Sequence, residues 1–176
     1  MKPTIILITG NMAAGKSTVA QALAERLPKS VHLRGDLFRR MIINGQVPMS
    51  FELNEEAVAQ LKLRYAIATT VAPMYLQAGF TVIYQDIIIG ETLADIVEVL
   101  RPHGLHVVVL CPDPAVVATR EAERGKRGYR SAAEIAFFDK VLRQETPPIG
   151  FWLDTSALTV AESVEQILNH LTAAAV

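Results

Sequence analysis

The chain has 176 residues and a formal net charge of -1, with 51% hydrophobic and 20% charged residues. This length fits one domain, 1–176, and the composition excludes an intrinsically disordered chain. Because the charge balance gives no long-range attraction to nucleic acid or to an anionic membrane, we expect neither as a partner. The single cysteine, Cys111, excludes an internal disulfide.

Along the chain, short apolar runs rich in Val and Ile alternate with longer helical patterns. The runs predict strands at 4–9, 30–34, 81–86, 105–111 and 151–154. The patterns predict helices at 16–27, 36–43, 54–78, 91–101, 113–124, 131–145 and 160–173. This alternation predicts an α/β fold of three layers, α/β/α, whose five-stranded parallel sheet is buried on both faces.

The apolar stretches are too short for export or membrane insertion. Residues 1–9 lack the apolar region of a signal peptide, and the stretch 65–80 is interrupted by Pro73 and Gln77. We therefore expect a cytoplasmic protein without a membrane span, with 65–80 in a buried helix. The sequence leaves a monomer and a homodimer both open.

The first predicted strand runs into GNMAAGKST, residues 10–18, and a helical pattern follows. This stretch matches the phosphate-binding motif G-x-x-x-x-G-K-[ST] in the required strand and helix context. Small residues let backbone amides approach a polyphosphate at the positive end of a helix. We predict that ATP is bound by Gly10, Asn11, Met12, Ala13, Ala14, Gly15, Lys16, Ser17 and Thr18. Lys16 is the predicted catalytic contact to the β and γ phosphates, and Ser17 the ligand of Mg²⁺.

A carboxylate follows the second predicted strand in RGDLFRR, residues 34–40. Asp36 is placed at the edge where parallel sheets bind ligands, and it could accept the proton of an attacking hydroxyl. A cap of the following helix is its other possible role. A GTPase would carry an Asn/Thr-Lys-x-Asp motif, which this sequence lacks.

The strand, GNMAAGKST, the helix and RGDLFRR together resemble the small-molecule and nucleic-acid kinases of the P-loop superfamily, over most of the chain. This group includes gluconate kinase, chloramphenicol phosphotransferase, zeta toxin and polynucleotide 5'-kinase. The resemblance implies a nucleoside-kinase-like P-loop NTPase fold, Asp36 as catalytic base and Arg39 as a contact to the acceptor. Arg40 and Arg64 are the other predicted substrate-binding residues.

The third predicted strand ends at Asp86, where an acid could hold Mg²⁺ directly or through water. The preceding residue, Gln85, is not a second acid. A basic segment, residues 120–130, predicts a lid of about 120–135 that closes over the transferred group. The similar kinases carry lid arginines at this place, which implies catalytic roles for Arg120, Arg124 and Arg127.

The segments expected to face the acceptor are mostly apolar and hold few cations. This favours a small neutral alcohol, such as a sugar or an antibiotic-like compound. A polynucleotide 5'-hydroxyl and a nucleotide sugar stay open as other acceptors. An ATP-binding regulatory protein without transfer activity is a further alternative, although such a switch has no need of Asp36.

Overall fold

The computed structural model describes residues 2–48, 54–123 and 128–173. Within these residues, a five-stranded sheet has the order β2-β3-β1-β4-β5, and every strand pair is parallel. The strands are β1 (Ile5–Gly10), β2 (Ser30–Arg34), β3 (Thr81–Gln85), β4 (Leu105–Leu110) and β5 (Phe151–Leu153). The predicted α/β fold with a parallel five-stranded sheet is confirmed.

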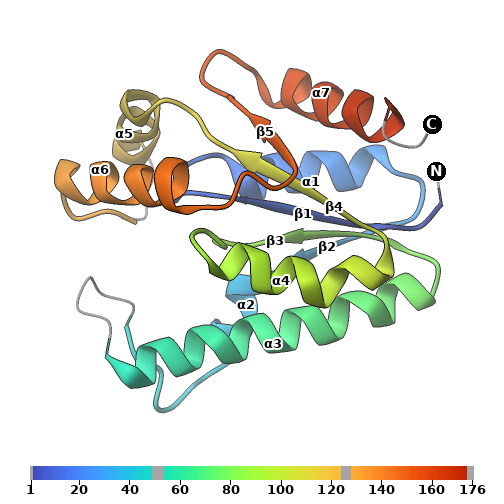
Figure 1. Cartoon of the computed structure of the whole chain (residues 1–176), viewed down its shortest axis with the longest axis horizontal. Helices are drawn as coiled ribbons and strands as arrows, with labels where there is room; N and C mark the ends of the chain where they lie inside the picture. Colours follow the sequence, from blue (N-terminus) through green and yellow to red (C-terminus); the bar gives the residue numbers. More distant parts are fainter. Residues whose placement is uncertain (1, 49–53, 124–127, 174–176) are drawn as a thin grey trace.

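Helices cover both faces of the sheet, as Figure 1 shows. One face carries α1 (Lys16–Arg26) and α7 (Val160–Ala173), and the other carries α3 (Glu55–Gln77) and α4 (Thr92–Leu100). The remaining helices are α2 (Gly35–Arg40), α5 (Pro114–Glu123) and α6 (Ala132–Lys140), with a 3₁₀ turn, η1 (Arg101–His103), and a π-helical turn, η2 (Val141–Glu145).

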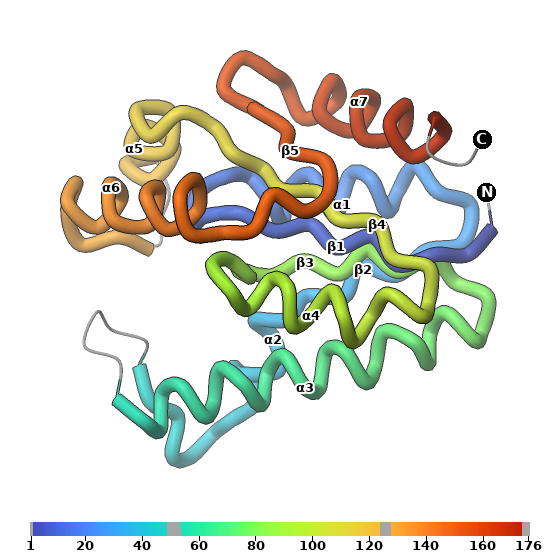
Figure 2. The backbone as a smooth tube through the Cα atoms, viewed as in Figure 1, coloured from blue at the N-terminus to red at the C-terminus, as the bar shows by residue number. Residues whose placement is uncertain are grey.

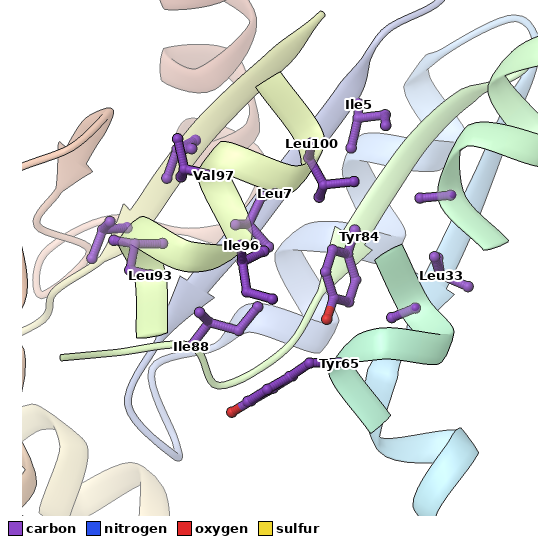
Figure 3. Packing of buried hydrophobic residues seen from close by; sticks show 14 of the residues in the cluster. Ile5, Leu7, Leu33, Tyr65, Tyr84, Ile88, Leu93, Ile96, Val97 and Leu100 are labelled. Atoms are coloured by element: carbon purple, nitrogen blue, oxygen red, sulfur yellow. The ribbon is translucent and has the colours of Figure 1, made fainter. Parts of the chain in front are cut away.

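The sheet separates two hydrophobic clusters, because successive side chains of a strand point to opposite faces. In β1, Ile5 and Leu7 pack with α3 and α4, while Ile6 and Ile8 pack with α1 and α7. Figure 3 shows the first cluster, in which Tyr84 of β3 lies near Leu7 and Leu33 beneath the helices. Burial on both sides explains why the strand sequences read as continuous apolar runs.

The predicted helix 36–43 is too long, since α2 ends at Arg40 and Ile43 is 85% exposed. The following turn is held to α3 by one amide side chain. Gln60 donates to the Gly45 carbonyl at 2.7 Å and accepts from the Val47 amide at 3.0 Å. These bonds hold the irregular segment that follows α2 against α3.

The apolar stretch 65–80 is helical up to Gln77, as predicted, but only one side of α3 is buried. Ala68 and Ala72 have no exposed surface, whereas Met74 is 63% exposed. The expected buried helix is therefore buried on one side only, because the other side of α3 lies on the outside of the molecule. In the described part of the chain, no helix is long and apolar enough to cross a membrane.

The carboxyl ends of the strands meet at one edge of the sheet, beside α5 and α6 (Figures 1 and 2). Parallel register places Ile8 of β1 next to Gln85 of β3, and Gly10 next to Leu110 of β4. The loops that leave this edge hold the predicted site residues.

Candidate functional site

The phosphate loop turns sharply between β1 and α1. Gly10 has φ +135°, and a Cβ there would lie 2.3 Å from the Leu110 carbonyl oxygen, so this position requires glycine. Gly15, with φ +92°, leads directly into the first turn of α1. The Lys16 side chain is 7% exposed and donates from Nζ to the Asn11 carbonyl at 2.6 Å. The lysine side chain is thus hydrogen-bonded back to the backbone of its own loop.

The loop opens into a cavity of about 520 Å³. Its walls combine residues from both ends of the chain and from the sheet edge: Met12–Val19, Asp36, Arg64, Gln85, Asp86, Ile87, Arg120, Glu123, Gly128, Thr155, Leu158, Val160 and Ser163. Most predicted site residues in the described chain therefore surround one cavity. Gly10, Asn11, Arg39 and Arg40 are not among the wall residues.

Ser17 at the start of α1 faces the end of β3. Its hydroxyl donates to Gln85 Oε1 at 3.1 Å, and Gln85 is only 5% exposed. The backbone register explains the contact, because Gln85 lies on the same face of β3 as Ile83, under α1.

Asp86 points to the opposite face and is 1% exposed. Arg64 of α3 binds it side-on, with Nε donating to Oδ2 at 3.0 Å and Nη2 donating to Oδ1. Burial raises the pKa of the Asp86 carboxyl, while Arg64 opposes the shift. Burial and Asp86 also raise the pKa of both Tyr65 and Tyr84, so these phenols stay neutral beside the ion pair.

Gly35 lets α2 approach this ion pair. A Cβ at Gly35 would lie 1.9 Å from Asp86 Oδ2 and 2.7 Å from its Cγ. The glycine of RGDLFRR therefore serves packing at the sheet edge, and no side chain fits there without displacing the carboxylate.

Asp36 lies in the first turn of α2 and contributes to the cavity wall. Arg40 Nη2 contacts Asp36 Oδ2 at 2.7 Å, while Arg34 Nε lies 3.5 Å from Oδ1, beyond usual hydrogen-bond length. Among the described residues, the buried Oδ1 atom has no hydrogen-bond donor. One carboxylate oxygen thus contacts Arg40, and the other lies in a longer ion pair with Arg34 without a hydrogen bond.

Arg120 is the described member of the predicted lid arginines, since Arg124 and Arg127 lie outside the described residues. Its Nη2 donates to the Thr155 carbonyl at 2.8 Å, and it forms part of the cavity wall. The chain returns to the loop at Tyr129, whose hydroxyl donates to the Met12 carbonyl at 3.2 Å. The base of the predicted lid is therefore attached to the phosphate loop.

Arg39 and Arg40 do not line the cavity, whereas Arg64 does. Arg40 is paired with Asp36, and Arg39 donates to the Val47 carbonyl. Burial lowers the pKa of Arg39, and the nearby positive charge of Arg64 adds to that effect. Their roles in acceptor binding stay predictions.

The predicted Mg²⁺ fits the oxygen groups at this edge, because the Ser17 hydroxyl and the Gln85 amide oxygen are ligand types that hard cations prefer. Across the three described ranges, no group of three or more His, Cys, Asp or Glu could hold a metal ion. The arrangement suits a cation carried mainly by nucleotide phosphates rather than one caged by carboxylates.

Sequence reasoning missed Gln85 as a wall residue. For Gln85, the available signal was its place at the end of a buried strand, directly before an acid. Thr155 follows β5, and its contact with Arg120 joins segments 35 residues apart in sequence. Only the folded sheet brings such positions together.

Solved structures of similar fold extend over nearly the whole chain. The Deinococcus radiodurans tunicamycin resistance protein has a TM-score of 0.72 at 17% identity, covering 97% of this chain and 96% of that one. The Mycobacterium tuberculosis APS kinase CysC, in complex with AMPPNP and APS, has a TM-score of 0.71 at 17% identity, covering 97% and 98%. A gluconokinase from Sinorhizobium meliloti 1021 has a TM-score of 0.69 at 19% identity, covering 97% and 92%.

These likenesses confirm the predicted P-loop kinase fold. No curated protein sequence matches the chain. The family model described as "Chloramphenicol phosphotransferase-like protein" matches residues 3–172, and together with the fold it supports ATP-dependent phosphotransfer in general. The chain therefore belongs to the chloramphenicol phosphotransferase-like family.

Proposed function

We propose that this protein, as one kinase domain, transfers the γ-phosphoryl group of ATP to a hydroxyl of a small molecule. The acceptor is a sugar or an antibiotic-like alcohol. The observation that carries the proposal is the shared cavity: Lys16 and Ser17 of the phosphate loop and Asp36 of α2 line the same cavity. A protein that only binds ATP has no need of the Asp36 carboxylate in this cavity.

Asp36 is the proposed base. Arg40 fixes one oxygen of the carboxylate, and the other oxygen lacks a donor within the described chain. Polar atoms buried without a partner are rare in native proteins, and a substrate hydroxyl would supply the missing donor. Asp36 would then orient the hydroxyl toward the γ-phosphorus and accept its proton during transfer.

On the nucleotide side, backbone amides of residues 10–18 and Lys16 would bind the phosphates. Mg²⁺ would be held by Ser17 and by groups at the end of β3, and it would neutralise charge on the β and γ phosphates. Arg120 borders the cavity and would contribute a positive charge next to the nucleotide.

The test uses purified protein with MgATP and a panel of acceptors: chloramphenicol, tunicamycin, gluconate and a 5'-hydroxyl oligonucleotide. We expect ADP release coupled to phosphorylation of an alcohol in this panel. The Asp36→Asn change should lower kcat by about 100-fold or more and leave the KM for ATP nearly unchanged. Asp95→Asn, at an exposed position of α4, is the matched control and should behave like the wild-type protein.

Undiminished transfer by Asp36→Asn would show that the proposed base is wrong. Transfer to the oligonucleotide alone would identify a polynucleotide kinase instead. ATP binding without transfer to any acceptor would favour the regulatory alternative.

A further inference from the structure

The neighbouring residues Gln85 and Asp86 at the end of β3 face opposite layers of the molecule. Gln85 contacts Ser17 at the start of α1, whereas Asp86 contacts Arg64 of α3. The alternation of a strand makes this separation unavoidable, because adjacent side chains cannot reach the same face. The end of this one strand therefore contacts both Ser17 next to the phosphate loop and Arg64 of α3.

The Asp86 carboxylate is fully engaged. Oδ2 accepts from Arg64 Nε, and Oδ1 accepts from Arg64 Nη2 and from the Ile87 amide at 2.7 Å. Gly35 packs against the same carboxylate, since a Cβ there would lie 1.9 Å from Oδ2. To bind a metal, Asp86 would have to abandon a buried bidentate ion pair.

Gln85 is placed differently, because its amide oxygen already lies 3.1 Å from the hydroxyl that the P-loop motif assigns to Mg²⁺. It is buried and belongs to the cavity wall. We propose that Gln85 supplies the β3 oxygen facing the metal at Ser17, and that Asp86 is a positioning residue that holds Arg64 toward the acceptor. This inference rests on the proposed function.

One edge of the Arg64 guanidinium lies outside its ion pair. Asp86 occupies the edge formed by Nε and Nη2, so Nη1 takes no part in this bidentate contact. Arg64 belongs to the same cavity wall as Asp36. Because Asp86 neutralises the guanidinium, Arg64 can donate hydrogen bonds without adding net charge. The acceptor class that fits is a neutral alcohol with a second oxygen, hydroxyl or carbonyl, beside the reacting hydroxyl.

The metal assignment is tested by binding of Mn²⁺–ADP, measured by electron paramagnetic resonance, which requires no acceptor. Gln85→Ala should weaken Mn²⁺–ADP binding about tenfold, and Gln85→Glu should strengthen it because a carboxylate binds hard cations better. Asp86→Asn should stay within about twofold of the wild-type value. Calorimetry with ADP in excess EDTA should give the same affinity for all variants.

Asp86→Asn leaves Arg64 without its partner and could fail to fold. The double variant Arg64→Leu/Asp86→Leu replaces the pair by apolar side chains, which proteins often tolerate, and it should also keep Mn²⁺–ADP affinity. A loss of about tenfold or more in either variant, with unchanged metal-free ADP binding, would overturn the inference. Unchanged affinity in Gln85→Ala would overturn it as well. If the wild-type protein binds no Mn²⁺–ADP, the proposed function itself is wrong.

The positioning role is tested with the best acceptor of the panel above. Arg64→Lys keeps the positive charge but loses the planar fork, so the KM for the acceptor should rise about tenfold while the KM for ATP stays unchanged. Asp86→Asn should likewise raise the KM for the acceptor and leave the KM for ATP unchanged. A rise in the Mg²⁺ requirement without a change in acceptor KM would assign Asp86 to the metal instead.

Discussion

The phosphate loop, residues 10–18, and the end of β3, residues 85–87, border the same cavity but acquire their geometry in different ways. In the loop, Lys16 donates to a carbonyl five residues away, so this contact lies within the sequence motif itself. At the end of β3, Gln85 contacts a residue 68 positions away and Asp86 one 22 positions away. A local motif can therefore be read from sequence, whereas the role of an isolated acid depends on the partner that folding brings to it.

The largest effect is expected in the loop, from Lys16→Met. This change removes the cation that is hydrogen-bonded to the loop backbone, so MgATP should bind about 10- to 100-fold more weakly. Turnover should fall about 100- to 1,000-fold, because the lysine also stabilises charge on the transferred group. Calorimetry and steady-state kinetics measure the two effects.

Lys62→Met, at an exposed position of α3, is the matched control for the loss of a lysine. If Lys16→Met kept the MgATP affinity of the control, the loop would not bind a nucleotide through this side chain. The sequence motif would then fail to predict how this loop binds a nucleotide.

The next largest effect is expected from Gly35→Ala, a change in α2 next to Asp86 at the end of β3. The new Cβ would overlap Asp86 Oδ2, so α2 or the Arg64 pair must shift. Such overpacking should lower the free energy of unfolding by about 1–3 kcal/mol, measured by urea denaturation. In Gly45→Ala, a Cβ would meet no atom within 4 Å and the cost would come from the positive φ of +79° alone. Equal stability of Gly35→Ala and the wild-type protein would contradict the close packing described for α2.

The strands, most helix limits and the nucleotide loop could be predicted from sequence because each depends on local patterns. The cap at Asn54, which accepts from the Ala57 amide at 2.7 Å, is also a local feature, because it joins residues three positions apart. The partner of Asp86 could not be predicted. An acid at the end of a strand looks the same whether it faces a metal or Arg64, and only the register of β3 and the course of α3 decide.

A smaller effect is expected where the predicted lid returns to the loop, from Tyr129→Phe. The ring is 5% exposed, and its hydroxyl donates to the Met12 carbonyl, so the change keeps the packing and removes a neutral hydrogen bond. The free energy of unfolding should fall by about 1 kcal/mol. Thermal unfolding measures it, and Tyr75→Phe on the exposed side of α3 is the control. A destabilisation no larger than that of the control would mean that this bond does not hold the two segments together.

The smallest effect is a pH dependence at His32, which lies on β2 beside α1 and accepts or donates at Nδ1 with Gln21 at 2.8 Å. Burial, followed by the charge of Arg34, lowers the pKa of His32 below its usual value. As the pH falls through about 6.5, the unfolded chain binds a proton at His32 before the native protein does. The free energy of unfolding therefore decreases from neutral pH toward lower pH, and His32→Gln should flatten this decrease.

His106 provides a comparison for that measurement, because burial lowers its pKa too. His32 lies on β2 and His106 on β4, with β3 and β1 between them, a separation of about 14 Å at the usual strand spacing. At this distance the effects of His32→Gln and His106→Gln on the melting temperature between about pH 7 and pH 5 should add. An unchanged slope in His32→Gln would mean that water reaches the imidazole in the native protein and that the end of β2 is more open than its contacts with α1 indicate.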